Sequence, residues 1–286
     1  MTKTIRIMIP DWQSGDNPVY FFGAQLLNWL APENPDQKLI KVPVAAPKKN
    51  QEHLEKENGV AAQSTVIDNV KKAQQAIDTE LPDKIITLGG NCMVSQAPFS
   101  YLHDKYGDDL GVIWIDAHPD ISNPQIFPNE HAMVLANLMG KGDPAVSKIV
   151  KNSISSDSIL YVGLQEPTDD EKKLLPELGL KYQVEDNNQV DIQKIQAWIN
   201  QHHFSKIAIH FDIDVLDRNL FFDQYFDEPG VTDYEVSGGK LDPDKAITIL
   251  NQLGSDNDLV GLTIAEYLPW SALKLRKLME NISIFN

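Results

Sequence analysis

The feature of this sequence that most constrains its fold is a regular alternation of short apolar runs with longer amphipathic stretches. Runs that are apolar nearly throughout are typical of strands covered on both faces, as in a parallel sheet. Their alternation with helical patterns indicates βαβ units. The sequence therefore predicts an α/β fold of three layers, α/β/α, around a mainly parallel central sheet. The predicted strands are Thr4–Ile9, Lys84–Leu88, Gly111–Ile115, Ser158–Val162, Lys206–Asp212 and Leu259–Ile264.

Three of the segments between these runs carry apolar residues at helical spacing, namely Ala62–Glu80, Ile192–Asn200 and Pro243–Leu253. Asp191 and Asp242 stand where the N-caps of the last two helices are expected. No repeat and no Pro/Ser-rich linker divides the 286 residues, so we predict one domain over residues 1–286. In open parallel sheets, ligands bind beyond the carboxyl ends of the strands, and the polar motifs of this chain fall there.

Composition argues against several classes of partner. The 25 Lys and Arg residues against 41 Asp and Glu give a net charge of −16, and no basic stripe is present, so nucleic acid is not a predicted partner. An acidic surface is repelled by anionic lipid, and no apolar run approaches the length of a membrane span, so we predict no membrane association. The single cysteine, Cys92, excludes an intrachain disulfide. With no export signal at the N-terminus, this predicts a cytoplasmic protein.

The apolar run Gly111–Ile115 is followed at alternate positions by Asp116, His118 and Asp120. In extended backbone, residues two apart point to one face. Hard carboxylate oxygens with a borderline nitrogen suit Mn²⁺ or a similar divalent ion. A solvated loop is the alternative interpretation, but a polar triplet closing a buried strand is costly without a partner.

A second motif repeats this spacing with His210, Asp212 and Asp214. Two such strands could bracket two cations and hold a hydroxide between them for metal-assisted hydrolysis. Without cations, this many acidic groups would repel one another and some would stay protonated. His210 has two open interpretations: a group acting at the metal site, as a ligand or behind the ligands, or a core histidine bonded to a carbonyl.

Four blocks of the sequence resemble, in order, the signature blocks of the ureohydrolases, the superfamily of arginase, agmatinase and formiminoglutamase. The resemblance spans most of the chain, and its specificity comes mainly from the two aspartate blocks. It implies an arginase-like fold and a homo-oligomer, either a trimer or a hexamer. The four blocks are Gly89-Gly90-Asn91-Cys92, Asp116-Ala117-His118-Pro119-Asp120, His210-Phe211-Asp212-Ile213-Asp214-Val215-Leu216-Asp217 and Glu266-Tyr267-Leu268-Pro269.

The resemblance implies a site with two divalent metal ions, Mn²⁺ in the first instance. Asp116 and Asp212 would bridge the ions, Asp120 would bind one of them, and His118 and Asp214 would bind the other. A hydroxide held between the ions would attack the guanidinium carbon of a guanidino substrate, or the equivalent carbon of a formimino compound. Urea or a related amide would be released.

The resemblance also implies roles in catalysis and substrate binding. Glu266 would hold the guanidinium group by paired hydrogen bonds, and it joins Asp214 and His131 as the catalytic residues. His131 would transfer a proton, which imidazole does well near neutral pH, although a surface histidine near a helix start is the alternative. Ser122 and Asn123, in the loop after the first aspartate block, would contact the substrate.

Two departures from the family pattern bear on function. The family block reads Gly-Gly-Asp-His where this chain has Gly89-Gly90-Asn91-Cys92, so Asn91 stands in place of an aspartate and Cys92 in place of a metal-binding histidine. A thiolate favours softer ions such as Zn²⁺ or Fe²⁺, with Co²⁺ and Ni²⁺ as further candidates. An inert buried thiol is the alternative for Cys92. Thr168 stands where arginases place an aspartate, which argues against L-arginine and leaves agmatine, a guanidino acid or a formimino compound.

Three functions follow from these observations. The preferred one is a binuclear amidinohydrolase that acts on a small guanidino compound. The second is a catalytically impaired relative that binds a ligand or regulates a partner subunit, with Cys92 marking decay of the first metal site. The third is a thiol enzyme with Cys92 as nucleophile, which would require a base beside it and a depressed thiol pKa.

Overall fold

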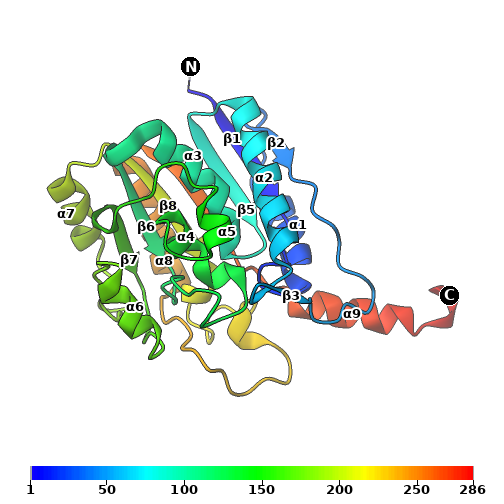
Figure 1. The fold of residues 1–286 in the computed structure, drawn as a ribbon. Helices are drawn as coiled ribbons and strands as arrows, with labels where there is room; N and C mark the ends of the chain where they lie inside the picture. The colour runs from blue at the N-terminus through cyan, green and yellow to red at the C-terminus, as the bar shows by residue number, and fades with distance from the viewer. Residues whose placement is uncertain (1, 286) are drawn as a thin grey trace.

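A seven-stranded parallel sheet forms the centre of the computed structural model, which describes residues 2–285 (Figure 1). The strand order is β2-β1-β5-β9-β8-β6-β7, and every neighbouring pair is parallel. A separate antiparallel pair, β3 (Lys56–Glu57) with β4 (Val60–Ala61), lies in a loop. The strands of the central sheet are β1 (Thr4–Ile9), β2 (Lys38–Lys41), β5 (Lys84–Gly89), β6 (Leu110–Ile115), β7 (Ile159–Val162), β8 (Lys206–Asp212) and β9 (Leu259–Ala265).

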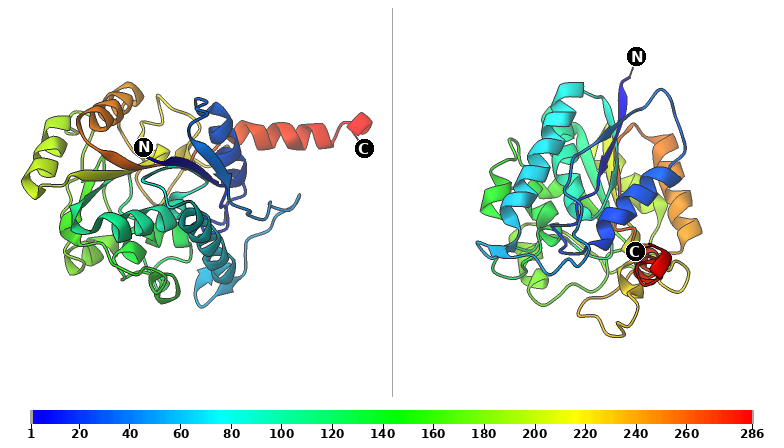
Figure 2. Two further views of the ribbon diagram at one scale, coloured as in Figure 1. Left: turned by 90° about the horizontal axis from the view of Figure 1, so that it is seen from above. Right: turned by 90° about the vertical axis from the view of Figure 1, so that its right-hand side faces the viewer.

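Helices cover both faces of the sheet, which confirms the predicted three layers. Helices α2 and α3 lie on one face and α1, α7 and α8 on the other (Figure 2). Helix α9 extends away from the sheet (Figure 1 and the left view of Figure 2). The helices are α1 (Val19–Leu30), α2 (Gln63–Glu80), α3 (Gln96–Tyr106), α4 (Val134–Leu138), α5 (Pro144–Ser147), α6 (Glu171–Glu177), α7 (Ile192–His202), α8 (Pro243–Asp256) and α9 (Trp270–Glu280).

The two faces of the sheet support separate hydrophobic clusters. Val66, Val70 and Ile77 of α2 pack into the larger cluster, and Ile195 of α7 and Ile249 of α8 into the second. Burial on both faces explains why the central strands are apolar throughout. Among the described residues, no helix is both long and apolar enough to cross a membrane.

All six predicted strands and all three predicted helices are present, with ends that differ by at most a few residues. Both predicted N-caps are confirmed. The Asp191 side chain accepts a hydrogen bond from the backbone N–H of Gln193, and Asp242 accepts from Asp244 and Lys245. The sequence analysis did not predict β2, α1 or α3.

Candidate metal centre

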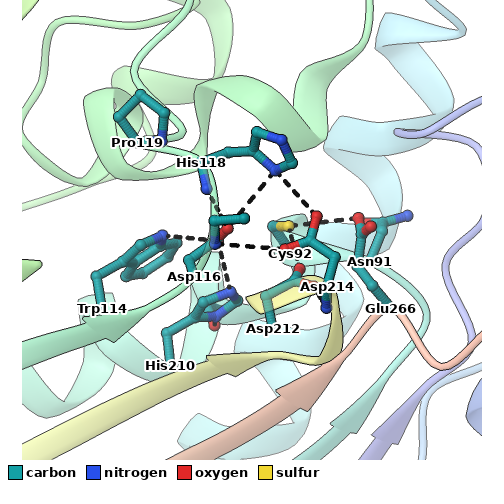
Figure 3. Close-up of polar contacts among 12 residues, drawn as sticks. Asn91, Cys92, Trp114, Asp116, His118, Pro119, His210, Asp212, Asp214 and Glu266 are labelled. Atoms are coloured by element: carbon teal, nitrogen blue, oxygen red, sulfur yellow. Dashed lines mark hydrogen bonds and ion pairs between the residues drawn. The ribbon is translucent and has the colours of Figure 1, made fainter. Parts of the chain in front are cut away.

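Four neighbouring strands place the candidate residues at one edge of the sheet. Cys92 follows β5, Asp116 follows β6, Asp212 ends β8 and Glu266 follows β9 (Figure 3). Because β5, β9, β8 and β6 are adjacent and parallel, their carboxyl ends lie side by side. This arrangement confirms the prediction that the polar motifs meet beyond the strand ends.

Turns, rather than extended backbone, aim several of these side chains. Strand β6 ends at Ile115, and Asp120 has a left-handed backbone with φ of 51°. Strand β8 ends at Asp212, whose Oδ1 accepts from the backbone N–H of Asp214 at 2.8 Å in a one-turn 3₁₀ helix. The premise of an extended backbone through both motifs was therefore wrong, although the residues do converge. Glu266 also has a positive φ, of 63°. Such conformations are costly for non-glycine residues and cluster at functional sites.

Burial and mutual repulsion dominate the electrostatics of the carboxylates. Burial raises the pKa of Asp116, and the nearby Asp214 raises it further. Burial raises the pKa of Asp120, and repulsion from Asp116 raises it further. Burial also raises the pKa of Asp212, and repulsion from Asp214 adds to this shift. Burial, then Asp214, raises the pKa of Glu266 to about 8. Divalent cations would remove this repulsion by neutralising the charges.

His118 and Asp214 form an ion pair within this cluster. The His118 Nδ1 lies 2.9 Å from Asp214 Oδ2 and 3.7 Å from Asp116 Oδ1. Burial opposes the charge on both partners, but the Asp214 carboxylate raises the pKa of His118, and His118 lowers that of Asp214. The raised pKa favours a protonated His118 beside these carboxylates. A metal ion would displace its proton, because a histidine ligand binds in the neutral form.

The donor atoms gather in three overlapping groups, and within each group they lie within 4.8 Å of one another. One group is Cys92, Asp116, Asp120 and His210, the second is Cys92, Asp212 and Glu266, and the third is Asp116, His118 and Asp214. Two buried atoms of the first group have no hydrogen-bond partner, Asp120 Oδ2 and His210 Nε2. His118 Nε2 also lacks one, but the nitrogen of His118 that faces Asp214 and Asp116 is Nδ1. Buried polar atoms are rarely left unpaired, so an unsatisfied set of metal-binding atoms fits a metal site.

Cys92 lies inside the cluster and not behind it. Its Sγ is 3.0 Å from Asp212 Oδ2 and 3.4 Å from Glu266 Oε1. Burial raises the pKa of the thiol well above its usual range, and the carboxylate of Asp120 raises it further. A nucleophilic cysteine needs a lowered pKa and a base beside it, so these surroundings argue against the thiol-enzyme interpretation.

His210 is fully buried and held on two sides. Its ring stacks on that of Trp114 with centroids 3.8 Å apart and an interplanar angle of 11°, and its Nδ1 lies 2.8 Å from Ser95 Oγ. The other ring nitrogen, Nε2, faces Asp116 Oδ2 at 3.5 Å, which is longer than a well-formed hydrogen bond. His210 is thus buried in the core, as the second interpretation expected, but the predicted carbonyl partner is wrong, because Nδ1 contacts a hydroxyl.

The remaining predicted residues, His131, Ser122 and Asn123, belong to none of the three donor groups. His131 Nδ1 lies 3.1 Å from the carbonyl oxygen of Ser14, and burial lowers the pKa of this histidine. Ser122 Oγ is buried without a hydrogen-bond partner. The Asn123 side-chain oxygen accepts from the backbone N–H of Gln125 at 3.0 Å, so this oxygen shapes the loop.

Some residues that support the cluster were not predicted from the sequence. Tyr20, buried in α1, lies close enough to Glu266 for its hydroxyl to lower the pKa of that carboxyl. Trp114 Nε1 donates to Asp116 Oδ2 at 3.0 Å. Trp114 carried a usable signal, because it precedes Asp116 by two positions. Nothing in the sequence pointed to Tyr20 or Ser95, which come from distant elements.

The fold and the buried set of carboxylate, imidazole and thiol donors define an α/β protein with a candidate metal centre at the carboxyl ends of its strands. A model of the arginase family matches residues 35–274. The chain therefore belongs to the arginase family. The arginase of Saccharomyces cerevisiae is 24% identical over 251 residues, 76% of this chain and 70% of the relative. The hepatic arginase of Aquarana catesbeiana is 32% identical over 147 residues, 47% of this chain and 45% of the relative.

Solved structures of this family share the fold. The arginase of Entamoeba histolytica in complex with L-ornithine has a TM-score of 0.78 and 20% identity, over 99% of this chain and 100% of that one. The formimidoylglutamase of Bacillus subtilis has a TM-score of 0.62 and 14% identity, over 96% of this chain and 84% of that one. The predicted ureohydrolase resemblance and the arginase-like α/β fold are thus confirmed.

Proposed function

We propose that this chain is a binuclear amidinohydrolase that acts on a small guanidino or formimino compound. The observation that carries the proposal is that Asp116 is shared by two donor groups, one with Cys92, Asp120 and His210 and the other with His118 and Asp214. A carboxylate shared in this way suits two ions a few ångström apart. When bound, the two ions supply an activated hydroxide at neutral pH and stabilise developing negative charge.

The side chains of this protein would bind the substrate and transfer protons during the reaction. Glu266 can accept paired hydrogen bonds from a guanidinium or formimino group, and the nearby Tyr20 hydroxyl lowers the pKa of this carboxyl. His131, whose lowered pKa keeps it neutral near pH 7, can accept a proton at Nε2 while Nδ1–H donates to Ser14. Ser122 and Asn123 would contact the other end of the substrate.

The surroundings of Thr168 support a substrate other than L-arginine. Thr168 Oγ1 accepts from the backbone N–H of Glu171 at 3.3 Å, and Glu171 Oε2 accepts from the Thr168 backbone N–H at 2.8 Å and from its hydroxyl at 2.9 Å. These reciprocal bonds resemble a capping box at the start of α6. Thr168 therefore stabilises the start of α6 and provides no carboxylate that could bind the α-amino group of L-arginine.

We further propose that residues 1–286 form one domain and that the chain assembles as a homo-oligomer. Helix α9 and the residues after it supply support, because Leu275, Leu278, Ile282 and Ile284 are exposed on a segment that extends away from the sheet. Apolar side chains gathered in this way are typical of an interface. A regulatory or ligand-binding role is the second candidate, favoured by Cys92 in place of the family's histidine.

The test counts metal ions first and then measures product. The purified chain is loaded with Mn²⁺ or Zn²⁺, freed of excess metal, and assayed for bound ions by elemental analysis. We expect two ions per chain and release of urea from a guanidino compound or of the amide from a formimino compound. Asp116→Asn should lower both affinity and rate at least about 100-fold, because this carboxylate serves both ions.

The matched control is Asp169→Asn, because the Asp169 side chain is 96% exposed and belongs to none of the donor groups. This variant should keep both its metal and its activity. Retention of fewer than two ions without turnover of any of these compounds would favour the binding or regulatory role.

A further inference from the structure

The donor group of Cys92, Asp116, Asp120 and His210 differs in kind from the group around His118. It contains a sulfur atom, and its imidazole comes from β8, whereas His118 follows β6. Asp120 Oδ2 and His210 Nε2 are both buried without a hydrogen-bond partner. Two unsatisfied atoms beside a thiol point to a ligand that the group is built to hold.

The contacts of His210 fix both its orientation and the direction of its free nitrogen. Stacking on Trp114 sets the plane of the ring, and the contact of Nδ1 with Ser95 Oγ sets its rotation. If Nδ1–H donates to the serine hydroxyl, Nε2 carries its lone pair toward Asp116 and Asp120. A metal-binding histidine usually gives its other N–H to such a partner, which fixes the tautomer.

We propose that Cys92, Asp116, Asp120 and His210 form a four-ligand site of one sulfur, one nitrogen and two oxygens that selects a zinc-class ion over manganese. The imidazole of His210 thereby replaces the one that the chain lacks at Cys92. In tetrahedral zinc, with bond lengths of about 2.0–2.3 Å, the ligand atoms lie about 3.3–3.8 Å apart. Donor atoms within 4.8 Å of one another need only a small contraction to reach this geometry.

The chemistry of the donors decides the choice of ion. Thiolate and imidazole favour Zn²⁺, Fe²⁺ and Co²⁺, whereas Mn²⁺ prefers carboxylate and water. The other group, with Asp116, Asp214 and His118, contains no sulfur. The inference rests on the proposed two-metal function only for the place of the site. Its ligands can be identified without any substrate.

The experiment uses the full chain in a His118→Ala background, in which the second group is impaired and one ion is expected to remain. The protein is loaded with Co²⁺ for absorption spectroscopy and with Zn²⁺ for X-ray absorption. We expect a near-ultraviolet thiolate-to-cobalt charge-transfer band, and a zinc shell with one sulfur and one imidazole. Adding Cys92→Ser should remove the band and the sulfur, and adding His210→Ala should remove the imidazole scattering.

Competition between Zn²⁺ and Mn²⁺ measures the selectivity. Cys92→Ser should lower the preference for Zn²⁺ at least about tenfold, and His210→Ala should weaken Zn²⁺ binding at least about tenfold. His202→Ala is the matched histidine control, because His202 lies at the end of α7, and it should change neither. Circular dichroism checks that every variant is folded.

Two results would overturn the inference. A zinc shell without sulfur would exclude Cys92, and imidazole scattering that persists in the His118→Ala/His210→Ala protein would exclude His210 as a ligand. A different result would refute the proposed hydrolase activity. A chain that binds two ions with the expected sulfur and imidazole but turns over no guanidino or formimino compound would refute the activity and leave the site intact.

Discussion

Asn91 shows how one substitution near the metal centre is accommodated. The family motif has an aspartate here, but the Asn91 side-chain amide donates to the Asp11 backbone oxygen at 3.1 Å and to its carboxylate at 3.2 Å. Its Oδ1 accepts from Ser14 Oγ at 2.8 Å. Asn69 also donates to the buried Asp11 carboxylate, at 2.7 Å. Neutral donors therefore compensate a buried charge at this position.

Restoring the family residue should destabilise the protein. Asn91→Asp would place a second buried carboxylate against Asp11 and remove a donor, so we expect the free energy of unfolding to fall by about 2–4 kcal/mol at pH 7. Urea unfolding with metal present measures the change. Asn188→Asp, on an exposed loop, is the matched control and should have little effect. An unchanged midpoint for Asn91→Asp would refute this account.

At the level of single residues, the sequence predicted the members of the donor cluster better than the residues that support them. Asp116 and Asp212 could be inferred because unpaired acids that close buried strands are costly without a cation. Ser95 and Tyr20 could not, because an isolated hydroxyl carries no pattern and their partners His210 and Glu266 are far away in the chain. Such contacts exist only once the sheet has formed.

At the level of elements, the apolar runs predicted the central strands. Helices without a clear helical period of apolar residues were not predicted. Helix α1 (Val19–Leu30) is apolar almost throughout and so lacks a clear helical period. Helix α3 (Gln96–Tyr106) contains Pro98 in its first turn, where proline is tolerated but reads as a breaker. Strand β2 (Lys38–Lys41) is at the edge of the sheet and mostly exposed, so it lacks the apolar run of the central strands.

The short 3₁₀ helix Glu130–Met133, which carries His131, contains a buried acid that is held protonated. Burial raises the pKa of Glu130 to about 8; Asn137, which donates to Glu130 Oε1 at 2.7 Å, opposes this shift, and the Asp143 carboxylate adds to it. In the unfolded chain a glutamate ionises near pH 4.3, at about its reference pKa. The stabilisation associated with protonated Glu130 is therefore complete below the unfolded pKa and lost as the pH rises through about 8.

Glu130→Gln should remove this pH dependence, because the amide imitates the protonated acid. Relative to the variant, the free energy of unfolding of the original protein should fall by about 1.4 kcal/mol per pH unit up to the folded pKa. Urea unfolding of both proteins between pH 6 and pH 9, at saturating metal, measures the difference. A difference that stays constant over this range would contradict the assignment.

At the level of the whole molecule, metal binding should contribute to stability. In the metal-free chain, burial and mutual repulsion raise the pKa values of Asp116, Asp120 and Asp212. Ions bound only by the folded state stabilise it by about 2.7 kcal/mol at 100 times their Kd. We expect a chelator to lower Tm by roughly 5–10 °C.

Differential scanning calorimetry with and without chelator checks this expectation. The loss should be larger at higher pH, because groups with a raised folded pKa become destabilising as the pH rises through that pKa. Asp169→Asn, with its metal centre intact, should show the same drop as the original protein. A Tm that does not change when the chelator is added would show that cations at the carboxylate cluster do not contribute to the stability of the fold.

The position of β9 has a consequence for how the protein is made. This strand is the last of the sheet in chain order, yet it lies between β5 and β8 and joins β2-β1-β5 to β8-β6-β7. During synthesis, each three-stranded half can begin to form before β9 leaves the ribosome, but the halves have no shared strand until then. Cys92 and Asp212, which come from opposite halves, are brought together only by that final insertion. The donor group of Cys92, Asp116, Asp120 and His210 is therefore complete only after β9 has been inserted, whereas the group of Asp116, His118 and Asp214 comes from one half of the sheet. An ion held by the first group would report that the sheet has closed.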